Sequence, residues 1–409
     1  MLCTGLRYGN GERIFYNHFF KAWIQNPPAL QIVSKGENLV PSIHIIDLAR
    51  LVRRIIEKNK VHPYIFAIDK TTRPSQKRLV QAISKGMGTG KIALDAPEVP
   101  GTTDDFLTIN LKMKVSEAFK DGELTPEEEE NADDAEALLK EKKFPWHCEK
   151  GVIGNIATLN KEFNEFRGLK PVKIFVTGPP ASGKSFYSAS IAKYYNIPHV
   201  HIKELTDAAL AISLLDEEQI GEDEEKANIK AKCDELRDKM VADMEEARGD
   251  PKEGEEWPEI DRTTLPIRVP DEILWKLLNT KLLENDCRNR GYILDGFPRT
   301  HKGAMNIFLK WKQVMNEDGE PEDEPEQDLE EGQEKDFSGY IPDADIMPAN
   351  CIILEGNDKD LTRRVRDLPE SKILGTHYTS KDMERRMKAY RLANNSIIAE
   401  PSVQDFFKT

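Results

Sequence analysis

The sequence predicts an α/β fold whose main domain is a parallel sheet of five strands with helices on both faces. Two stretches carry this prediction. In Val172 to Ser185 an apolar, β-branched run stops at Gly178, and a helical pattern begins a few residues later. Gly291 to Asp295 is an apolar strand that ends in a carboxylate. Strands that alternate with helices in this way are typical of parallel sheets.

The first stretch contains a phosphate-binding loop. Residues 178–185 match G-x-x-x-x-G-K-S and lie between a strand and a helix, the context that this motif requires and that disfavours a fortuitous glycine-rich turn. In such a loop the backbone amides point inward, and the helix start adds its positive dipole end. We expect Lys184 to reach the outer phosphates of ATP and the Ser185 hydroxyl to hold Mg²⁺, as in P-loop NTPases. The expected nucleotide contacts in the loop are Gly178, Ala181, Ser182, Gly183, Lys184, Ser185 and Phe186.

Composition limits the class of protein. A chain of 409 residues is long for one core and favours two domains. Residues 317–336 hold twelve acidic residues and one lysine, so most of the net charge of −14 lies in one segment. No basic stretch resembles a nucleic-acid footprint, and no apolar run approaches the length of a membrane span. We expect a soluble, intracellular monomer that binds neither nucleic acid nor membrane.

The cysteines and histidines give no metal motif. Five cysteines are widely spaced without a C-x-x-C, which is typical of free thiols in a reducing compartment and disfavours a zinc site. The eight histidines form no H-E-x-x-H. His199 and His201 lie at strand spacing, and we interpret them as partly exposed strand residues.

Residues 1–115 predict part of a Rossmann-like α/β domain. A strand at residues 39–46 leads into an amphipathic helix that Asp47 is expected to cap. Residues 6–9 and 40–49 resemble the carboxyl-terminal half of extended short-chain dehydrogenases and nucleotide-sugar epimerases. That family's G-x-x-G-x-x-G and Tyr-x-x-x-Lys motifs are missing, which disfavours an epimerase or reductase. We expect the chain to begin inside that domain.

Three charged segments interrupt the globular pattern. Residues 116–170 predict an acidic linker, within which 151–167 is expected to form a short helix at the front of the next domain. Residues 216–256 carry an apolar stripe at helical spacing, which predicts a hairpin or a helix that faces a partner. Residues 317–336 predict a disordered acidic loop.

The second informative stretch is Gly291 to Arg299. A P-loop enzyme needs an acid beside Mg²⁺ at a strand end, where Asp295 lies, and Arg299 offers a planar fork for a phosphate. An ordinary Asp-Gly turn with a surface arginine is the alternative. The loop, the Val-Pro-Asp segment at 269–271 and the D-G-F-P-R run occur in the same order in adenylate kinases, so residues 171–409 resemble that family.

The resemblance implies a function and a set of site residues. It implies reversible transfer between Mg·ATP and AMP to give two ADP, in the cytoplasm and, by similarity to members of motile cilia and sperm flagella, in a cilium or flagellum. It also implies a monophosphate-binding region at 207–266 and a lid at 364–384. Lys184, Asp295, Arg299 and Arg386 are the expected catalytic residues. Further nucleotide contacts are expected from Val269, Gly296, Phe297, Pro298, Arg364 and Arg366.

Arg386 is chosen over Arg385 on helical periodicity. It lies three residues after Met383, and Met387 and Tyr390 continue the same apolar stripe, so Arg386 should face inward and Arg385 outward.

The sequence also departs from the adenylate kinase pattern. Glu204 and Ala209 stand where the family has a threonine and an arginine that contact AMP, and Gly303 replaces a glutamine that reads the base. The final strand and helix are compressed into 396–407. The alternative function is therefore a scaffold of a ciliary assembly that binds ATP with little turnover and meets protein partners through its acidic insertions.

Overall fold

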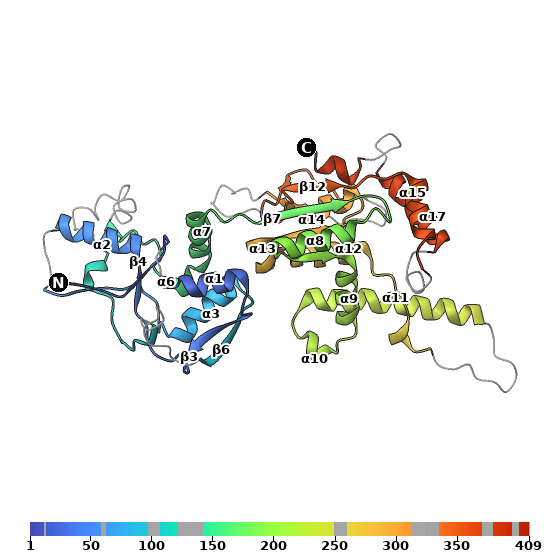
Figure 1. Ribbon diagram of the computed structural model, residues 1–409. Helices are drawn as coiled ribbons and strands as arrows, with labels where there is room; N and C mark the ends of the chain where they lie inside the picture. Colours follow the sequence, from blue (N-terminus) through green and yellow to red (C-terminus); the bar gives the residue numbers. More distant parts are fainter. Residues whose placement is uncertain are drawn as a thin grey trace, which may run out of the picture. The chain divides into compact units, whose positions relative to one another are not determined.

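A computed structural model of the chain describes residues 1–11, 14–58, 63–96, 107–121, 142–248, 260–312, 325, 335–369, 379–394 and 401–408. The chain divides into two compact units, Met1–Lys170 and Pro171–Thr409 (Figure 1). Each unit has its own hydrophobic core. Among the described helices, none combines the length and apolar character that a membrane span needs.

The first unit is built from short parallel strand pairs and helices. Its strands are β1 (Leu2–Thr4), β2 (Leu6–Tyr8), β3 (Ala29–Val33), β4 (Ser42–His44), β5 (Ile65–Ala67) and β6 (Lys91–Ala96). β1 pairs with β5, β2 with β4, and β3 with β6, all parallel. The helices are α1 (Tyr16–Ile24), α2 (Ile45–Lys58), α3 (Gln76–Met87), the 3₁₀ turn η2 (Glu117–Phe119), α6 (Gly151–Gly154) and α7 (Ile156–Arg167). An α/β class is confirmed for this unit, while its relation to epimerases stays a prediction.

Three expectations for the first unit are wrong. Residues 142–170 are not a linker, and α7 does not belong to the next domain, because Leu159 and Phe163 of α7 enter the core that α1 and α3 share. Leu159 and Phe163 are four residues apart and so lie on one face of the helix, and an apolar face of this kind is buried against a core. Asp47 does not cap α2, which begins at Ile45; its carboxylate is used elsewhere, as described below. Residues 122–141 of the expected linker lie outside the described residues.

The second unit contains a parallel sheet of four strands within the described residues, with the order β12-β7-β9-β8. These strands are β7 (Val172–Thr177), β8 (His199–His201), β9 (Gly291–Asp295) and β12 (Asn350–Ile353). The five-stranded prediction is therefore not confirmed. The fifth strand was expected within 396–407, of which residues 395–400 lie outside the described part and 401–408 hold the short helix α18 (Val403–Phe406). A small antiparallel pair, β10 (Leu309–Trp311) with β11 (Tyr340–Pro342), lies apart from the main sheet.

Helices cover both faces of this sheet, because alternate residues of the central strands point to opposite sides (Figure 1). Ile174 and Val176 of β7 pack with α8 (Lys184–Tyr195), whereas Phe175 packs into the larger core on the other face. That larger core is formed with α9 (Ile202–Ser213), α11 (Glu224–Arg248), α12 (Asp271–Leu283), α13 (Asn285–Arg290), α14 (His301–Phe308) and α18. The shorter elements α10 (Glu217–Ile220) and η3 (Arg262–Thr264) flank α11 along the chain.

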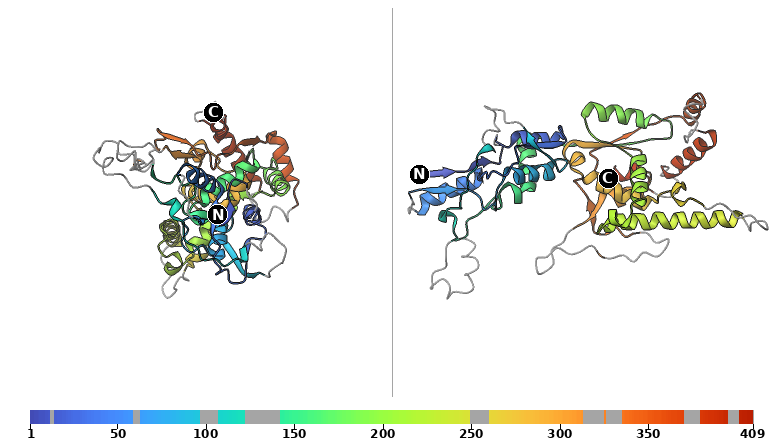
Figure 2. Two further views of the ribbon diagram at one scale, coloured as in Figure 1. Left: turned by 90° about the vertical axis from the view of Figure 1, so that its left-hand side faces the viewer. Right: turned by 90° about the horizontal axis from the view of Figure 1, so that it is seen from below.

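Helix α11 occupies the charged insertion expected at residues 216–256. Ile229 and Cys233 of its apolar stripe are buried in the same core as α9, and Met244 near its far end is 37% exposed. The stripe thus packs first against its own unit, which corrects the expected partner-facing helix. Figure 2 shows α11 as the long helix of the second unit. The acidic loop expected at 317–336 falls almost entirely outside the described residues.

Candidate active site

The loop between β7 and α8 curls tightly beside the end of β12. Gly178 and Gly183 have positive φ values of 154° and 98°. A Cβ atom at Gly178 would lie 2.6 Å from the carbonyl oxygen of Leu354, so this position requires glycine. The loop therefore has the close backbone approach that a phosphate cradle needs.

Lys184 is the first residue of α8 and turns back over the loop. Its Nζ atom donates hydrogen bonds to the carbonyl oxygens of Gly178 and Pro179, at 2.7 and 2.8 Å. Burial lowers the pKa of Lys184 to about 8; Asp295 acts against this shift, whereas the positive charges of Arg386 and Arg299 add to it. Side chains far apart in the sequence thus converge on one ammonium group.

Asp295 lies at the end of β9 and is only 3% exposed. Parallel pairing of β8 with β9 places His201 opposite Asp295, and His199 Nε2 lies 3.3 Å from Asp295 Oδ2. Burial alone would raise the pKa of Asp295, but hydrogen bonds from His199 and Ser185, with the nearby His201, leave that pKa below its ordinary value. The carboxylate is therefore kept ionised.

The two histidines were not predicted as site residues. Their strand spacing was visible in the sequence, but the pairing of β8 with β9 was not. The only available signal was two imidazoles on one side of a strand that ends near the phosphate loop.

The turn after Asp295 places Arg299 near other cations. Phe297 and Pro298 are buried and anchor the turn. Gly296 has φ +64°, which favours glycine, and a Cβ there would lie only 3.0 Å from Lys184 Cε. Arg299 is exposed at the surface, but partial burial still lowers the pKa of its guanidinium; the nearby Arg386 and Arg268 lower that pKa further, and Asp271 acts in the opposite direction.

Arg268 was not among the site residues expected from the sequence. Its signal was its position next to Val269, which is buried in the core and fixes the segment before α12.

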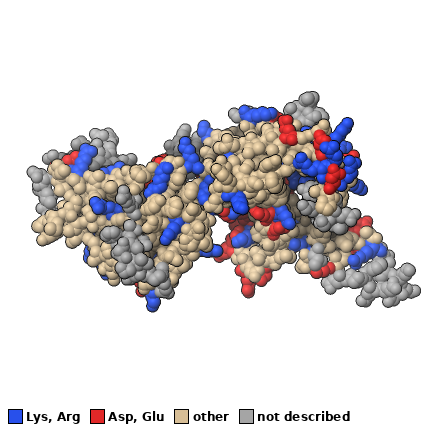
Figure 3. Space-filling view, in the orientation of Figure 1, with Lys and Arg blue, Asp and Glu red and all other residues tan. Residues whose placement is uncertain are grey.

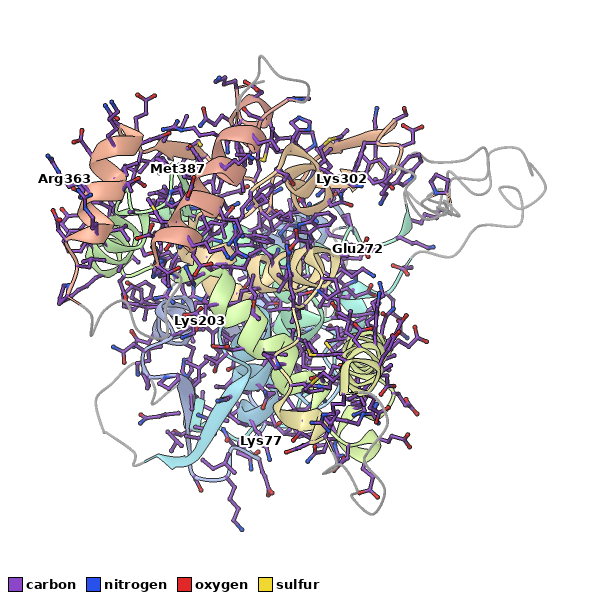
Figure 4. All side chains as sticks on the ribbon, turned by 90° about the vertical axis from the view of Figure 1, so that its right-hand side faces the viewer. Lys77, Lys203, Glu272, Lys302, Arg363 and Met387 are labelled. Carbon is purple, nitrogen blue, oxygen red and sulfur yellow. The ribbon has the colours of Figure 1, made fainter. Side chains whose placement is uncertain are left out.

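Two helices after β12, α15 (Asp358–Arg366) and α17 (Ser380–Ala393), pack against the loop through Ala181. Arg364 Nη1 donates to the Ala181 carbonyl oxygen at 3.1 Å. In Figure 4 Met387 lies between these helices, and Arg363 lies on the outer side of the pair. Lysines and arginines mix with acidic residues on the visible surface of this region (Figure 3).

The arginines of these helices divide by position. Arg386 is half-buried beside the buried Met383 and Met387 and acts on Lys184, whereas Arg385 is exposed and pairs with Asp382 at 3.0 Å. Arg366 has an exposed side chain, and within the described residues no hydrogen bond or ion pair joins it to the loop. Phe186 is 72% exposed, so the protein itself does not cover it. The expected lid residues 370–378 lie outside the described part.

The residues present fit a magnesium nucleotide. In the described part of the chain the Ser182 hydroxyl is buried within the loop without a hydrogen-bond partner, and such a group normally has one. Ser185 hydrogen-bonds the ionised Asp295, so two oxygen donors of the kind that Mg²⁺ prefers already lie together. The arrangement can bind a polyphosphate, accept a second phosphate at the arginines, and hold a hard cation between them.

The positions that depart from the adenylate kinase pattern lie outside this charge cluster. Glu204 is exposed on α9, while Ala209 is fully buried in the core, where an arginine would not fit. A Cβ at Gly303 would lie 3.1 Å from both Trp275 Nε1 and Pro298 Cβ. A side chain at position 303 would therefore fit only if Trp275 and Pro298 shifted by a few tenths of an ångström.

The chain is similar to proteins named adenylate kinase 7 along its whole length. It is 30% identical to the one from Macaca fascicularis over 425 aligned residues, covering all of this chain and 68% of that relative. It is 31% identical to the one from Mus musculus, covering 96% of this chain and 58% of that relative. An adenylate kinase of Clostridium perfringens is 30% identical over 141 residues, which is 34% of this chain and 46% of that enzyme. No family model matches the sequence.

Proposed function

Because the chain belongs to the adenylate kinase family and is a phosphotransferase, we propose that it catalyses reversible phosphoryl transfer between Mg·ATP and AMP, giving two ADP. The observation that carries this proposal is the convergence of Lys184, Arg299 and Arg386 on the loop beside Asp295. Transfer of this kind needs positioning and neutralisation of charge spread over phosphate oxygens. The cluster supplies both without a covalent intermediate.

Each group has a role in the proposed reaction. The loop amides and Lys184 bind the ATP phosphates, which replace the Gly178 and Pro179 carbonyl oxygens as partners of the ammonium group. Ser185 and Asp295 would hold Mg²⁺, which would neutralise negative charge on the phosphates. Arg299 binds the acceptor phosphate, and Arg386 stabilises charge that develops during transfer. The floor of the nucleotide site is formed by Val269, Gly296, Phe297 and Pro298. Arg364 holds the phosphate-binding loop in place through its hydrogen bond to the Ala181 carbonyl oxygen.

A second candidate function is an ATP-binding scaffold with little turnover. The observation that favours it is Gly303, which lies against Trp275 and has no side chain with which to contact the AMP base. In this alternative the loop binds ATP while the acceptor pocket stays weak. Protein partners would then meet the acidic insertions.

One experiment separates these functions. The purified protein is titrated in a calorimeter with a bisubstrate analogue, in which a row of phosphates joins two adenosines. A separate titration uses Mg·ATP. The kinase predicts tight binding of the analogue and ADP formation from ATP plus AMP. Binding of Mg·ATP without ADP formation would support the scaffold, and absence of any heat at millimolar nucleotide would overturn both.

Location and assembly are proposed from the resemblance alone. We propose a monomer in the cytoplasm of a cilium or flagellum. Light scattering of the purified chain and tagging in ciliated cells test the two statements. A stable dimer, or a tagged protein excluded from cilia, would contradict them.

A further inference from the structure

The first unit holds a buried polar cluster that the proposed phosphoryl transfer does not use. One ring nitrogen each of His44 and His147 and the sulfur of Cys148 all lie within 4.8 Å of one another. His44 and Cys148 are fully buried, and the His147 side chain is 27% exposed. The cysteine spacing disfavoured a zinc site, because local spacing does not reveal that β4 and the segment before α6 bring these residues together in the fold.

We propose that His44, His147 and Cys148 bind a Zn²⁺ ion. Two imidazole nitrogens and one thiolate are the donors that Zn²⁺ takes in proteins, and they disfavour Mg²⁺ or Ca²⁺, which prefer oxygen. Three protein ligands leave a fourth tetrahedral position for water. The partly exposed His147 gives the ion a route to the site.

Glu162 of α7 orients both histidines. His44 Nε2 lies 3.0 Å from one of its carboxylate oxygens, and His147 Nε2 lies 2.6 Å from the other. Ligation through the Nδ1 atoms would keep both of these hydrogen bonds. A carboxylate that accepts from the far nitrogen of a ligating histidine is the usual support of a zinc site, since it fixes the ring and its tautomer.

Ligation of His44 through Nδ1 would replace one hydrogen bond. That atom now accepts from the backbone amide of Ile46, at 3.2 Å. Ile46 lies in the first turn of α2, where amides have no helical partner and solvent or a side chain serves instead. The exchange therefore disturbs no other part of the cluster.

The backbone around the cluster is fixed before any metal binds. The buried Asp47 carboxylate accepts the amides of His147 and Cys148, at 2.6 and 2.9 Å, and so holds both donor residues in place. On the opposite side, a Cβ at Gly9 would overlap the His44 ring, with 1.9 Å to Nε2. Glycine at this position leaves the space that the ring occupies.

The test uses the full chain, stripped with a chelator and free of nucleotide. Zn²⁺ alone is titrated against a competing chromophoric chelator, and Co²⁺ alone is added while the near-ultraviolet thiolate-to-metal absorption is recorded. We expect one equivalent of tight Zn²⁺ and a thiolate band with Co²⁺. Cys148→Ala and His147→Gln should each weaken Zn²⁺ binding at least tenfold, and Cys148→Ala should abolish the band.

Cys3→Ala, in the same unit, is the matched control and should leave both signals intact. Circular dichroism confirms that each variant is folded. The wild-type cobalt spectrum keeps the proposal falsifiable even where a variant misfolds. Absence of the thiolate band in folded wild type, or equal Zn²⁺ affinity in wild type and folded variants, would overturn the site.

Discussion

The phosphate loop of the second unit and the buried cluster of the first unit use similar polar groups but balance them in opposite ways. Near Lys184 two arginines add positive charge. The Lys184 ammonium group donates hydrogen bonds to backbone carbonyl oxygens of the loop. Around Glu162 two imidazoles and the Asn10 amide each donate to the carboxylate. Clustered positive charge is costly without an anion, so the loop is prepared for phosphate. In the first unit the Glu162 carboxylate already has its partners within the protein, so the two histidines are held in place before any ion binds.

The largest expected effect comes from removing the ammonium group of the loop. Lys184→Ala should reduce ADP formation by about 1000-fold or more, because it removes the ammonium group that lies over the loop carbonyl oxygens, where the ATP phosphates would bind. A coupled assay measures the rate, and circular dichroism checks the fold. Activity equal to wild type in the folded variant would remove the proposed reaction and move the assignment to the scaffold.

The two adjacent arginines of α17 give a matched pair. Arg386→Ala should lower kcat by about 100-fold, because its charge acts on the transferring phosphate. Arg385→Ala should change kcat less than about twofold, since this exposed side chain pairs with Asp382. Steady-state kinetics on both variants decide the point. Equal losses would mean that the cluster around Lys184 does not include α17.

Substitutions in the first unit should change the local stability of that unit and not the rate of ADP formation. Asp47→Asn replaces one of the two carboxylate oxygens that accept the His147 and Cys148 amides, and should cost about 2 kcal/mol of local opening free energy. Hydrogen exchange of peptides from residues 142–167 measures it. Asp121→Asn is the control: that exposed carboxylate accepts only the Phe144 amide in the described part of the chain, and the change should cost less than about 1 kcal/mol. Similar protection in both variants would contradict a role for Asp47 in holding the cluster.

The sequence could predict what is local in the site. The strand, loop and helix around Gly178 and the inward face of Arg386 follow from short-range periodicity, and the structure places Lys184, Asp295 and Arg299 together. The neighbours of these residues could not be predicted, because they depend on pairing between distant segments. His199 meets Asp295 through the register of β8 and β9, and Arg268 meets Arg299 through the core that buries Val269.

The same limit explains the errors in the fold. A charge-rich composition predicted a linker at 116–170, but the apolar Leu159 and Phe163 inside it decide where α7 packs. The cysteine pattern excluded zinc motifs because such motifs are read from local spacing. His44 and Cys148 become neighbours only through the tertiary fold.

The smallest predicted effect is the pH dependence of Mg·ATP affinity. It tests whether the pKa of Lys184 is lowered in the protein without nucleotide. With its pKa near 8 in the free protein, Lys184 loses its proton as pH rises through that value, while bound phosphates would hold the proton and raise the pKa. Mg·ATP affinity should therefore be constant below about pH 7 and fall by up to about tenfold per pH unit above 8, with proton uptake on binding. Calorimetry in buffers of different ionisation enthalpy measures both, in a range where the ATP phosphates are already fully ionised. Lys184→Arg should flatten the profile, because a guanidinium stays charged throughout. A flat wild-type profile between about pH 8 and 9.5 would mean that burial and the neighbouring arginines do not lower the pKa of Lys184, and the contrast between the two units would then rest on hydrogen bonds alone.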